Sequence, residues 1–370
     1  MERHRIQSAP ARLLAFIHNP WRWFVAYWRS GWGHKILTCF LVLVIVCLGG
    51  MYGIARWYIW QEEKKPLVIG TSFIADYASS LGLDAHQTML AILDDLHVKH
   101  LRLVSYWNDI EPQKGQYNFS ELDWEFAQAN VHHAKVTLAI GLRQPRWPEC
   151  HVPSWVDPGA PQSTWQPQLE QFIGTVVERY KNNPALENYQ LENEYYLDTF
   201  GICSNDKRER LTAEMDLVHA IDPKHTLIVS RSDNALGWPV HPQLPDETGI
   251  SIYRRVWTPI LGRYIEYPFP SWYYAFLAGG EKIMTGRDTV IHELQTEPWP
   301  PHGTPFVQVS LAEQNKSFDA ARFKDTVAFA KNTGMRPTDL WGAEYWYYRK
   351  EKLHDPSLWQ VAQQVFQTSQ

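Results

Sequence analysis

Residues Tyr189 to Tyr196 read Y-Q-L-E-N-E-Y-Y, a short strand-like run that ends in two carboxylates and an amide. Just beyond it the chain turns irregular, so this strand end could present an acid to a pocket. Glu194 is the candidate acid, and Asn193 beside it can donate and accept hydrogen bonds. A strict two-residue period would place these neighbours on opposite faces, so we expect the strand to bulge or end there. An isolated Asn-Glu pair is more often a solvated strand end, and it gains weight only if a later strand supplies a second carboxylate.

Short apolar strands alternate with helical segments along the rest of the chain. The candidate strands are Leu67–Ser72, His100–Val104, Lys135–Gly141, Leu186–Glu192, Thr226–Ser230, Gly249–Tyr253, Thr289–Glu293 and Asp339–Ala343. The candidate helices are Asp84–Val98 with an Asp cap, Ser120–His133 with a Ser cap, Gln168–Tyr180, Arg208–Ile221 and Phe318–Asn332. Eight strands in this alternation predict an α/β fold, a (β/α)8 TIM barrel. A doubly wound sheet is the alternative, but no glycine-rich phosphate turn follows the first strand.

An uncharged apolar run lies near the N-terminus, and its twenty residues would span roughly 30 Å as a helix, the thickness of a bilayer core. Tryptophan and tyrosine flank it on both sides, as in interfacial anchors. The segment before it carries six Lys and Arg against one Glu, so the positive-inside rule keeps that end in the cytoplasm. We therefore predict a single-pass cell-membrane protein with a cytoplasmic segment 1–35, a transmembrane helix 36–55, a linker 56–65 and an extracellular domain 66–370. A cleaved signal peptide is the alternative, although no cleavage site is clear.

The four cysteines divide between these parts. Cys39 and Cys47 lie in the apolar run, whereas Cys150 and Cys203 fall in predicted loops of the exported part, where oxidation is permitted. We predict a Cys150–Cys203 disulfide that joins two neighbouring loops. The slightly negative net charge of −5, with basic residues clustered only at the N-terminus, argues against nucleic acid as a partner. The fifteen histidines show no metal-ligand spacing, so no metal is predicted.

Chemistry in a barrel of this kind sits at the C-terminal ends of the strands. Those ends bring two carboxylates, Glu194 and Glu293, together with Arg102 and Tyr253. An Arg and a Tyr hydroxyl keep a neighbouring carboxylate ionised, whereas a more enclosed carboxyl stays protonated and can donate a proton. The alternative nucleophile is Glu297, which precedes a proline beyond the apolar run that Glu293 ends. The expected aromatic neighbours, which could also be lid or core residues, are Trp107, Trp147 and Trp346.

Three motifs carry a resemblance to a known group of enzymes. Q-L-E-N-E-Y (Gln190–Tyr195), V-I-H-E-L-Q (Val290–Gln295) and the E-P-x-x-G-x-Y-x-F stretch within Leu101–Asp123 resemble the clan A retaining glycoside hydrolases, the cellulase and β-galactosidase superfamily. The resemblance covers roughly Leu67 to Trp346. It does not fix the family within the clan.

The resemblance implies a role for each site residue. Glu194 would be the proton donor, Asn193 would bind the sugar 2-hydroxyl and Glu293 would be the nucleophile. The expected protein is thus an exported retaining glycoside hydrolase that acts on an oligo- or polysaccharide, with β-linkages preferred, without a cofactor and as a monomer. A transglycosylase with the same site, or a catalytically silent barrel that binds glycan, are the alternatives.

Overall fold

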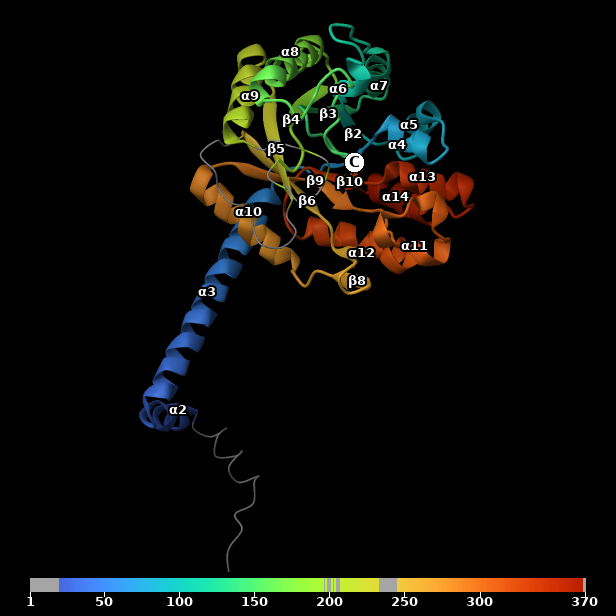
Figure 1. Cartoon of the computed structure of the whole chain (residues 1–370). Helices are drawn as coiled ribbons and strands as arrows, with labels where there is room; N and C mark the ends of the chain where they lie inside the picture. Colours follow the sequence, from blue (N-terminus) through green and yellow to red (C-terminus); the bar gives the residue numbers. More distant parts are fainter. Residues whose placement is uncertain are drawn as a thin grey trace, which may run out of the picture. The chain divides into compact units, whose positions relative to one another are not determined.

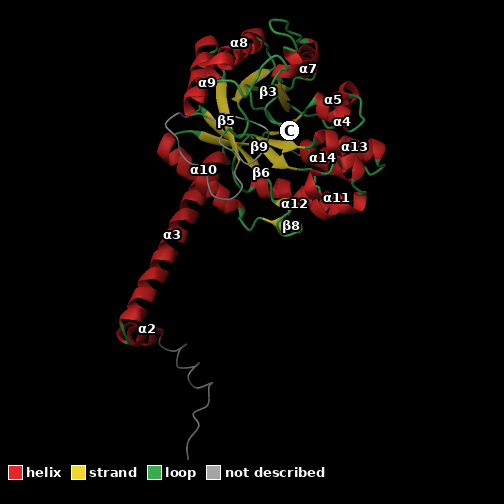
Figure 2. Ribbon diagram, in the orientation of Figure 1, coloured by secondary structure: helices red, strands yellow, loops and turns green. Residues whose placement is uncertain are grey.

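The computed structural model describes residues 20–195, 197, 201, 203, 207–232 and 245–368. Eight parallel strands close into a barrel in the order β1-β10-β9-β6-β5-β4-β3-β2, and helices surround them (Figures 1 and 2). The predicted TIM barrel is therefore confirmed. Of the motif Tyr189–Tyr196, the structure describes every residue except Tyr196.

All eight predicted strands are present, with ends that differ by a few residues. The barrel strands are β1 Ile69–Ser72, β2 His100–Val104, β3 Lys135–Ile140, β4 Leu186–Leu191, β5 Thr226–Ser232, β6 Glu247–Ile252, β9 Asp288–Gln295 and β10 Thr338–Trp341. An antiparallel hairpin, β7 Arg255–Thr258 with β8 Arg263–Glu266, was not predicted.

The helices of the barrel unit include the five predicted ones. They are α4 Ala75–Ser80, α5 Ala85–Asp94, α6 Trp107–Ile110, α7 Ser120–Val131, α8 Gln162–Tyr180, α9 Arg208–Ile221, α10 Ser271–Thr285, α11 Leu311–Ser317, α12 Ala320–Lys331, α13 Ala343–Lys352 and α14 Ser357–Gln367. Two short 3-10 turns, Pro301–Gly303 and Phe306–Gln308, follow β9. The Asp84 cap is confirmed, because its side chain accepts a hydrogen bond from the Gln87 amide at 2.8 Å. The Ser120 cap is wrong, because the Ser120 amide and hydroxyl both donate to the Asn118 side chain.

A buried polar cluster fills part of the barrel interior. Asp339 on β10 accepts from His100 Nδ1 at 2.7 Å and lies 3.1 Å from His292 Nδ1. A Cβ atom on Gly70 would lie 2.3 Å from an Asp339 oxygen and 2.5 Å from His100 Nδ1. Glycine at position 70 therefore makes room for a hydrogen-bonded carboxylate inside the barrel, where an unpaired charge would be costly.

The chain divides into two compact units, Met1–Ile54 and Ala55–Gln370. The first contains α2 (Pro20–Arg29) and most of α3 (Trp32–Glu62), the one described helix long and apolar enough to cross a membrane; a signal sequence would have the same features. The stretch 56–65, predicted to be a linker, is helical as far as Glu62. Tyr58, Ile59 and Glu62 of this stretch are buried, and they belong to the barrel unit.

Candidate active site

Three polar residues of the motif, Glu192, Asn193 and Glu194, form a tight turn directly after β4. The strand ends at Leu191, and the next residues include two with left-handed backbone, Glu192 at φ 58° and Glu194 at φ 45°. Non-glycine residues are uncommon in this region, and such conformations concentrate at functional sites. The expectation that the strand ends at Asn193 and Glu194 is met by this turn.

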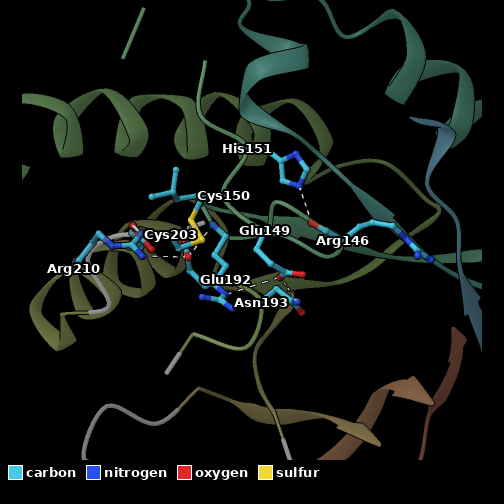
Figure 3. Close-up of a disulfide and its surroundings, with 11 residues drawn as sticks. Arg146, Glu149, Cys150, His151, Glu192, Asn193, Cys203 and Arg210 are labelled. Carbon is cyan, nitrogen blue, oxygen red and sulfur yellow. Dashed lines mark hydrogen bonds and ion pairs between the residues drawn. A yellow bond between two sulfur atoms is a disulfide. The ribbon is translucent and has the colours of Figure 1, made fainter. Parts of the chain in front are cut away.

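Glu192 holds the turn in place. Its carboxylate accepts from the amides of Leu142 (2.6 Å) and Arg143 (3.0 Å) and from the Arg210 guanidinium at 3.0 and 3.2 Å. The pair of Glu192 and Arg210 is visible in Figure 3. Because all these bonds are buried, Glu192 is a structural residue that ties the loop after β3 to α9.

Arg102 on β2 is the centre of the site and is fully buried. Its Nε donates to Gln190 Oε1 at 2.6 Å and its Nη2 to Asn193 Oδ1 at 2.9 Å. Its Nη1 donates to Glu293 Oε1 at 3.0 Å. One guanidinium therefore fixes residues of β4 and β9 relative to each other, using the fork of donors that arginine supplies.

Glu293 lies within β9, two residues before the strand end, not at its end as predicted. The pairing with β6 skips His292, since Ile250 and Ser251 pair with Ile291 and Glu293. Such a bulge lets His292 bond to Asp339 while Glu293 faces Arg102. The Tyr253 hydroxyl donates to Glu293 Oε2 at 2.7 Å. Arg102 and Tyr253 thus each bind one oxygen of the Glu293 carboxyl group.

Glu194 lies in a different environment. Burial and the negative charge of Glu293 raise its pKa to about 7, against the opposing influence of Arg143 and Arg102. Its amide donates to Ser230 Oγ at 2.9 Å. The two carboxyls thus interact electrostatically, and one of them is protonated in part at neutral pH, which is the division of roles that acid and base catalysis needs.

Glu297 is held by other partners. Arg146 donates to both of its oxygens, at 2.9 and 3.4 Å, and the Tyr77 hydroxyl donates at 2.9 Å. The Arg146 guanidinium also lies 4.2 Å from the ring centre of Trp341. Glu297 is therefore engaged in a bidentate ion pair, while Glu293 is the carboxylate that shares Arg102 with Asn193.

The three predicted tryptophans lie in different environments. Trp107 and Trp346 are fully buried, and their indole N–H groups donate to Glu111 and to the Thr296 carbonyl, both at 2.7 Å. Both are core residues, which pack against Phe172 and Phe323 respectively. Trp147 is 59% exposed on the loop after β3, so it is the one of the three whose side chain solvent can reach.

A third carboxyl, which the sequence did not single out, reaches the site from the loop after β3. Asn193 Nδ2 donates to Glu149 Oε2 at 3.0 Å (Figure 3), and burial together with the charges of Glu194 and Glu293 raises the Glu149 pKa to about 8. Beside it, Cys150 and Cys203 form the predicted disulfide, with 5.3 Å between their Cα atoms. Glu149 lies in an irregular loop, 44 residues before Asn193 in the sequence, so no local sequence pattern could reveal their contact.

Comparison with protein-family models finds no match, and comparison with curated proteins finds none either. Solved structures do match. A β-galactosidase from Marinomonas ef1 has a TM-score of 0.54 at 13% identity over 81% of this chain and 59% of its own. A GH10 endoxylanase from a sugarcane soil metagenome gives 0.53 at 14% identity over 82% and 99%. A GH5_18 structure from Bifidobacterium longum gives 0.53 at 13% over 75% and 70%. The chain therefore shares the barrel fold of these glycoside hydrolase structures.

Proposed function

We propose that this protein is a retaining glycoside hydrolase in which Glu194 is the general acid and base and Glu293 the nucleophile. The observation that carries the proposal is the unequal setting of the two carboxyls. Glu293 is bound by Arg102 and Tyr253, whereas Glu194 is enclosed and has its pKa raised to about 7. The glycoside hydrolase neighbours with the same fold add support.

In the proposed reaction, Glu194 protonates the glycosidic oxygen while Glu293 attacks the anomeric carbon, and the aglycone leaves as an alcohol. Water then adds to the anomeric carbon of the glycosyl-Glu293 ester, Glu194 takes its proton, and Glu293 is released. Arg102 holds Glu293 and Asn193 in fixed positions relative to each other in both steps. Retention requires the two carboxyls to be about 5 to 5.5 Å apart. The sugar formed first would therefore have the anomeric configuration of the substrate.

We further propose that α3 anchors the enzyme in the cell membrane, with residues 1–35 in the cytoplasm and the barrel outside. The length and hydropathy of α3 support an anchor, and the Cys150–Cys203 disulfide fits an exported domain, where such bonds persist. A reporter fused after Gln370 and tested for activity on each side of the membrane would decide the orientation. Reporter activity in the cytoplasm would contradict it.

The function itself is tested with the full-length protein in detergent, on a panel of aryl β-glycosides and β-glucans. We expect turnover by the wild type and, for Glu194→Gln, a loss of about 10² to 10⁴-fold on substrates with poor leaving groups. Glu293→Gln should lose turnover on every substrate.

Two controls make the result specific. Proton NMR of the first product must show the retained anomer; an inverted anomer would contradict the double displacement. Glu209→Gln, at an exposed position near the start of α9, should keep wild-type rates. Full activity of Glu293→Gln together with loss in Glu297→Gln would transfer the nucleophile to Glu297.

A further inference from the structure

A cavity of about 200 Å3 opens beside the ends of β1 and β2. Ile74, two residues after β1, and Tyr106, two residues after β2, form part of its wall, so it lies at the same end of the barrel as Glu194 and Glu293. Its four carboxyl groups come from three helices. They are Asp76 of α4, Asp109 of α6, and Glu121 and Glu125 of α7.

The carboxyl groups form a funnel with a buried base. Asp76, Asp109 and Glu121 are exposed at the rim, whereas Glu125 is only 4% exposed. Among the described lining residues there is no lysine, arginine or histidine. A cleft lined by one sign of charge concentrates counter-ions of the opposite sign.

Glu125 is the residue that the fold alone does not explain. Within the described part of the chain its carboxyl has no hydrogen bond or ion pair. Burial and the negative charges of Glu121, Asp76 and Glu344 raise the pKa of Glu125 well above its ordinary value, so a cation bound beside it would favour its ionised form. The other acids have partners: Asp109 shares a hydrogen bond with Asp76, and Glu121 lies 3.0 Å from His86. A buried carboxyl without a partner costs free energy that a ligand could offset.

The chemistry of this lining selects the ligand class. No group of His, Cys, Asp and Glu in the described residues has an arrangement that could hold a metal ion. A protonated primary amine instead carries one positive charge and three N–H donors, which can bond to several carboxylates at once. The volume is below that of usual drug-sized pockets, so the cavity suits a small molecule or a single sugar unit.

We propose that this cavity binds a protonated primary amine, with Glu125 at its base and Asp76, Asp109 and Glu121 at its entrance. The proposal rests on these carboxyls alone and holds whether or not the barrel cleaves glycosides. The amine could belong to an amino sugar or to a small alkylamine, which share the recognised group.

Isothermal titration of the full-length protein in detergent tests the proposal with three probes. Glucosamine represents the amino sugar, propylamine the alkylamine, and N-acetylglucosamine is a neutral sugar without the charge. We expect at least one of the two amines to bind, and N-acetylglucosamine to bind at least about tenfold more weakly, because charge-assisted bonds are lost. Binding of propylamine alone would assign the site to alkylamines, and binding of glucosamine alone to amino sugars.

Variants locate the binding. Glu125→Gln should weaken amine binding by about tenfold or more, because glutamine cannot take up the negative charge that a bound ammonium group would favour at the base. Asp76→Asn should also weaken it and serves if Glu125→Gln does not fold, which its melting temperature will show. Glu209→Gln and Glu293→Gln should bind the amine like the wild type.

Two results would overturn the proposal. One is that neither amine binds at millimolar concentration. The other is amine binding that Glu293→Gln abolishes while Glu125→Gln and Asp76→Asn leave it unchanged, because the amine would then lie in the candidate active site. If the wild type hydrolyses no glycoside, the amine-binding test is unaffected. The proposed glycosidase activity and the proposed amine site can therefore fail separately.

Discussion

At the scale of single residues, Arg102 positions the side chains of the candidate site, and the surroundings of Glu194 set its pKa. Arg102 contacts Gln190, Asn193 and Glu293 with separate nitrogens, so one side chain sets the geometry of two strands. Glu194 stands apart from that hydrogen-bond set, and its enclosure raises its pKa. The contrast between Glu293 and Glu194 therefore follows from their neighbours, since both are glutamates.

The pH dependence of the rate follows from Glu194. Its pKa is raised to about 7 by burial and by Glu293, and the proposed acid works only when protonated. The value of kcat/KM should therefore fall as pH rises through about 7, by about tenfold per pH unit. A pH profile on a substrate with a poor leaving group measures this. With Glu194→Gln and an activated aryl substrate the fall should vanish; an unchanged profile would contradict the role of Glu194.

Glu149 should act through Asn193. Its Oε2 atom accepts from Asn193 Nδ2 at 3.0 Å, while Asn193 Oδ1 accepts from Arg102, so the two bonds fix the amide orientation. We expect Glu149→Met to lower kcat/KM by about tenfold on a substrate with a 2-hydroxyl and to leave its 2-deoxy analogue nearly unchanged. Glu149→Gln keeps an acceptor oxygen and should behave like the wild type. Equal losses on both substrates would show a general structural effect instead.

At the scale of residues, the site residues that could be predicted from the sequence are those on or directly after the barrel strands. Glu194, Glu293, Arg102 and Tyr253 could be found because the end of each strand is visible as the end of an apolar run. Glu149 could not, because its position depends on an irregular loop, with left-handed backbone at φ 71°.

At the scale of elements, the barrel strands could be predicted and the insertion after β6 could not. Buried parallel strands are continuous apolar runs, which are recognisable in a sequence. Helix α10 contains the pair Gly279 and Gly280, which has low helix propensity, so its sequence resembles a loop. Its buried face, with Tyr274, Ala275 and Ala278, supplies the stability that propensity does not.

The polar cluster inside the barrel makes a prediction about Gly70. Gly70→Ala would bring a Cβ atom within 2.3 Å of Asp339 and 2.6 Å of the His100 carbonyl, so β1, β2 and β10 would have to move apart. We expect it to lower the free energy of unfolding by about 1 to 3 kcal/mol or more. The matched control is Gly280→Ala, whose Cβ meets nothing within 4 Å and which should stabilise α10 by about 0.5 to 1 kcal/mol. Thermal unfolding measures both; equal melting temperatures for the two variants would contradict this packing.

At the scale of the whole molecule, the end of α3 belongs to the barrel. Besides the burial of Tyr58 and Ile59, Glu62 lies 2.7 Å from both Lys65 and Lys282. Gly334 packs against this turn, since its Cβ would lie 3.1 Å from the Ile59 Cα atom. From the sequence we expect a linker at 56–65, between the apolar run that ends at Ala55 and the domain from residue 66. Tertiary packing instead makes the compact unit begin at Ala55.

This packing predicts how truncated fragments behave. A fragment that starts at Ala55 should keep the stability of the barrel unit, whereas one that starts at Pro66 loses Tyr58 and Ile59 from the core. A buried aliphatic side chain such as Ile59 contributes about 1.5 to 3 kcal/mol, so the shorter fragment should melt at a clearly lower temperature. Differential scanning calorimetry of both fragments checks this. Identical melting temperatures would show that the last turns of α3 contribute nothing to the fold.

The central claim is that Glu293 forms a covalent bond with the sugar. The most direct measurement is incubation of the full-length protein with activated fluorosugars of different configuration, which trap the glycosyl-enzyme, followed by peptide mass mapping. We expect one added sugar on the peptide that contains Glu293, and no label in Glu293→Gln. A label on Glu297, or the absence of any label with a fluorosugar whose parent glycoside the enzyme hydrolyses, would contradict it.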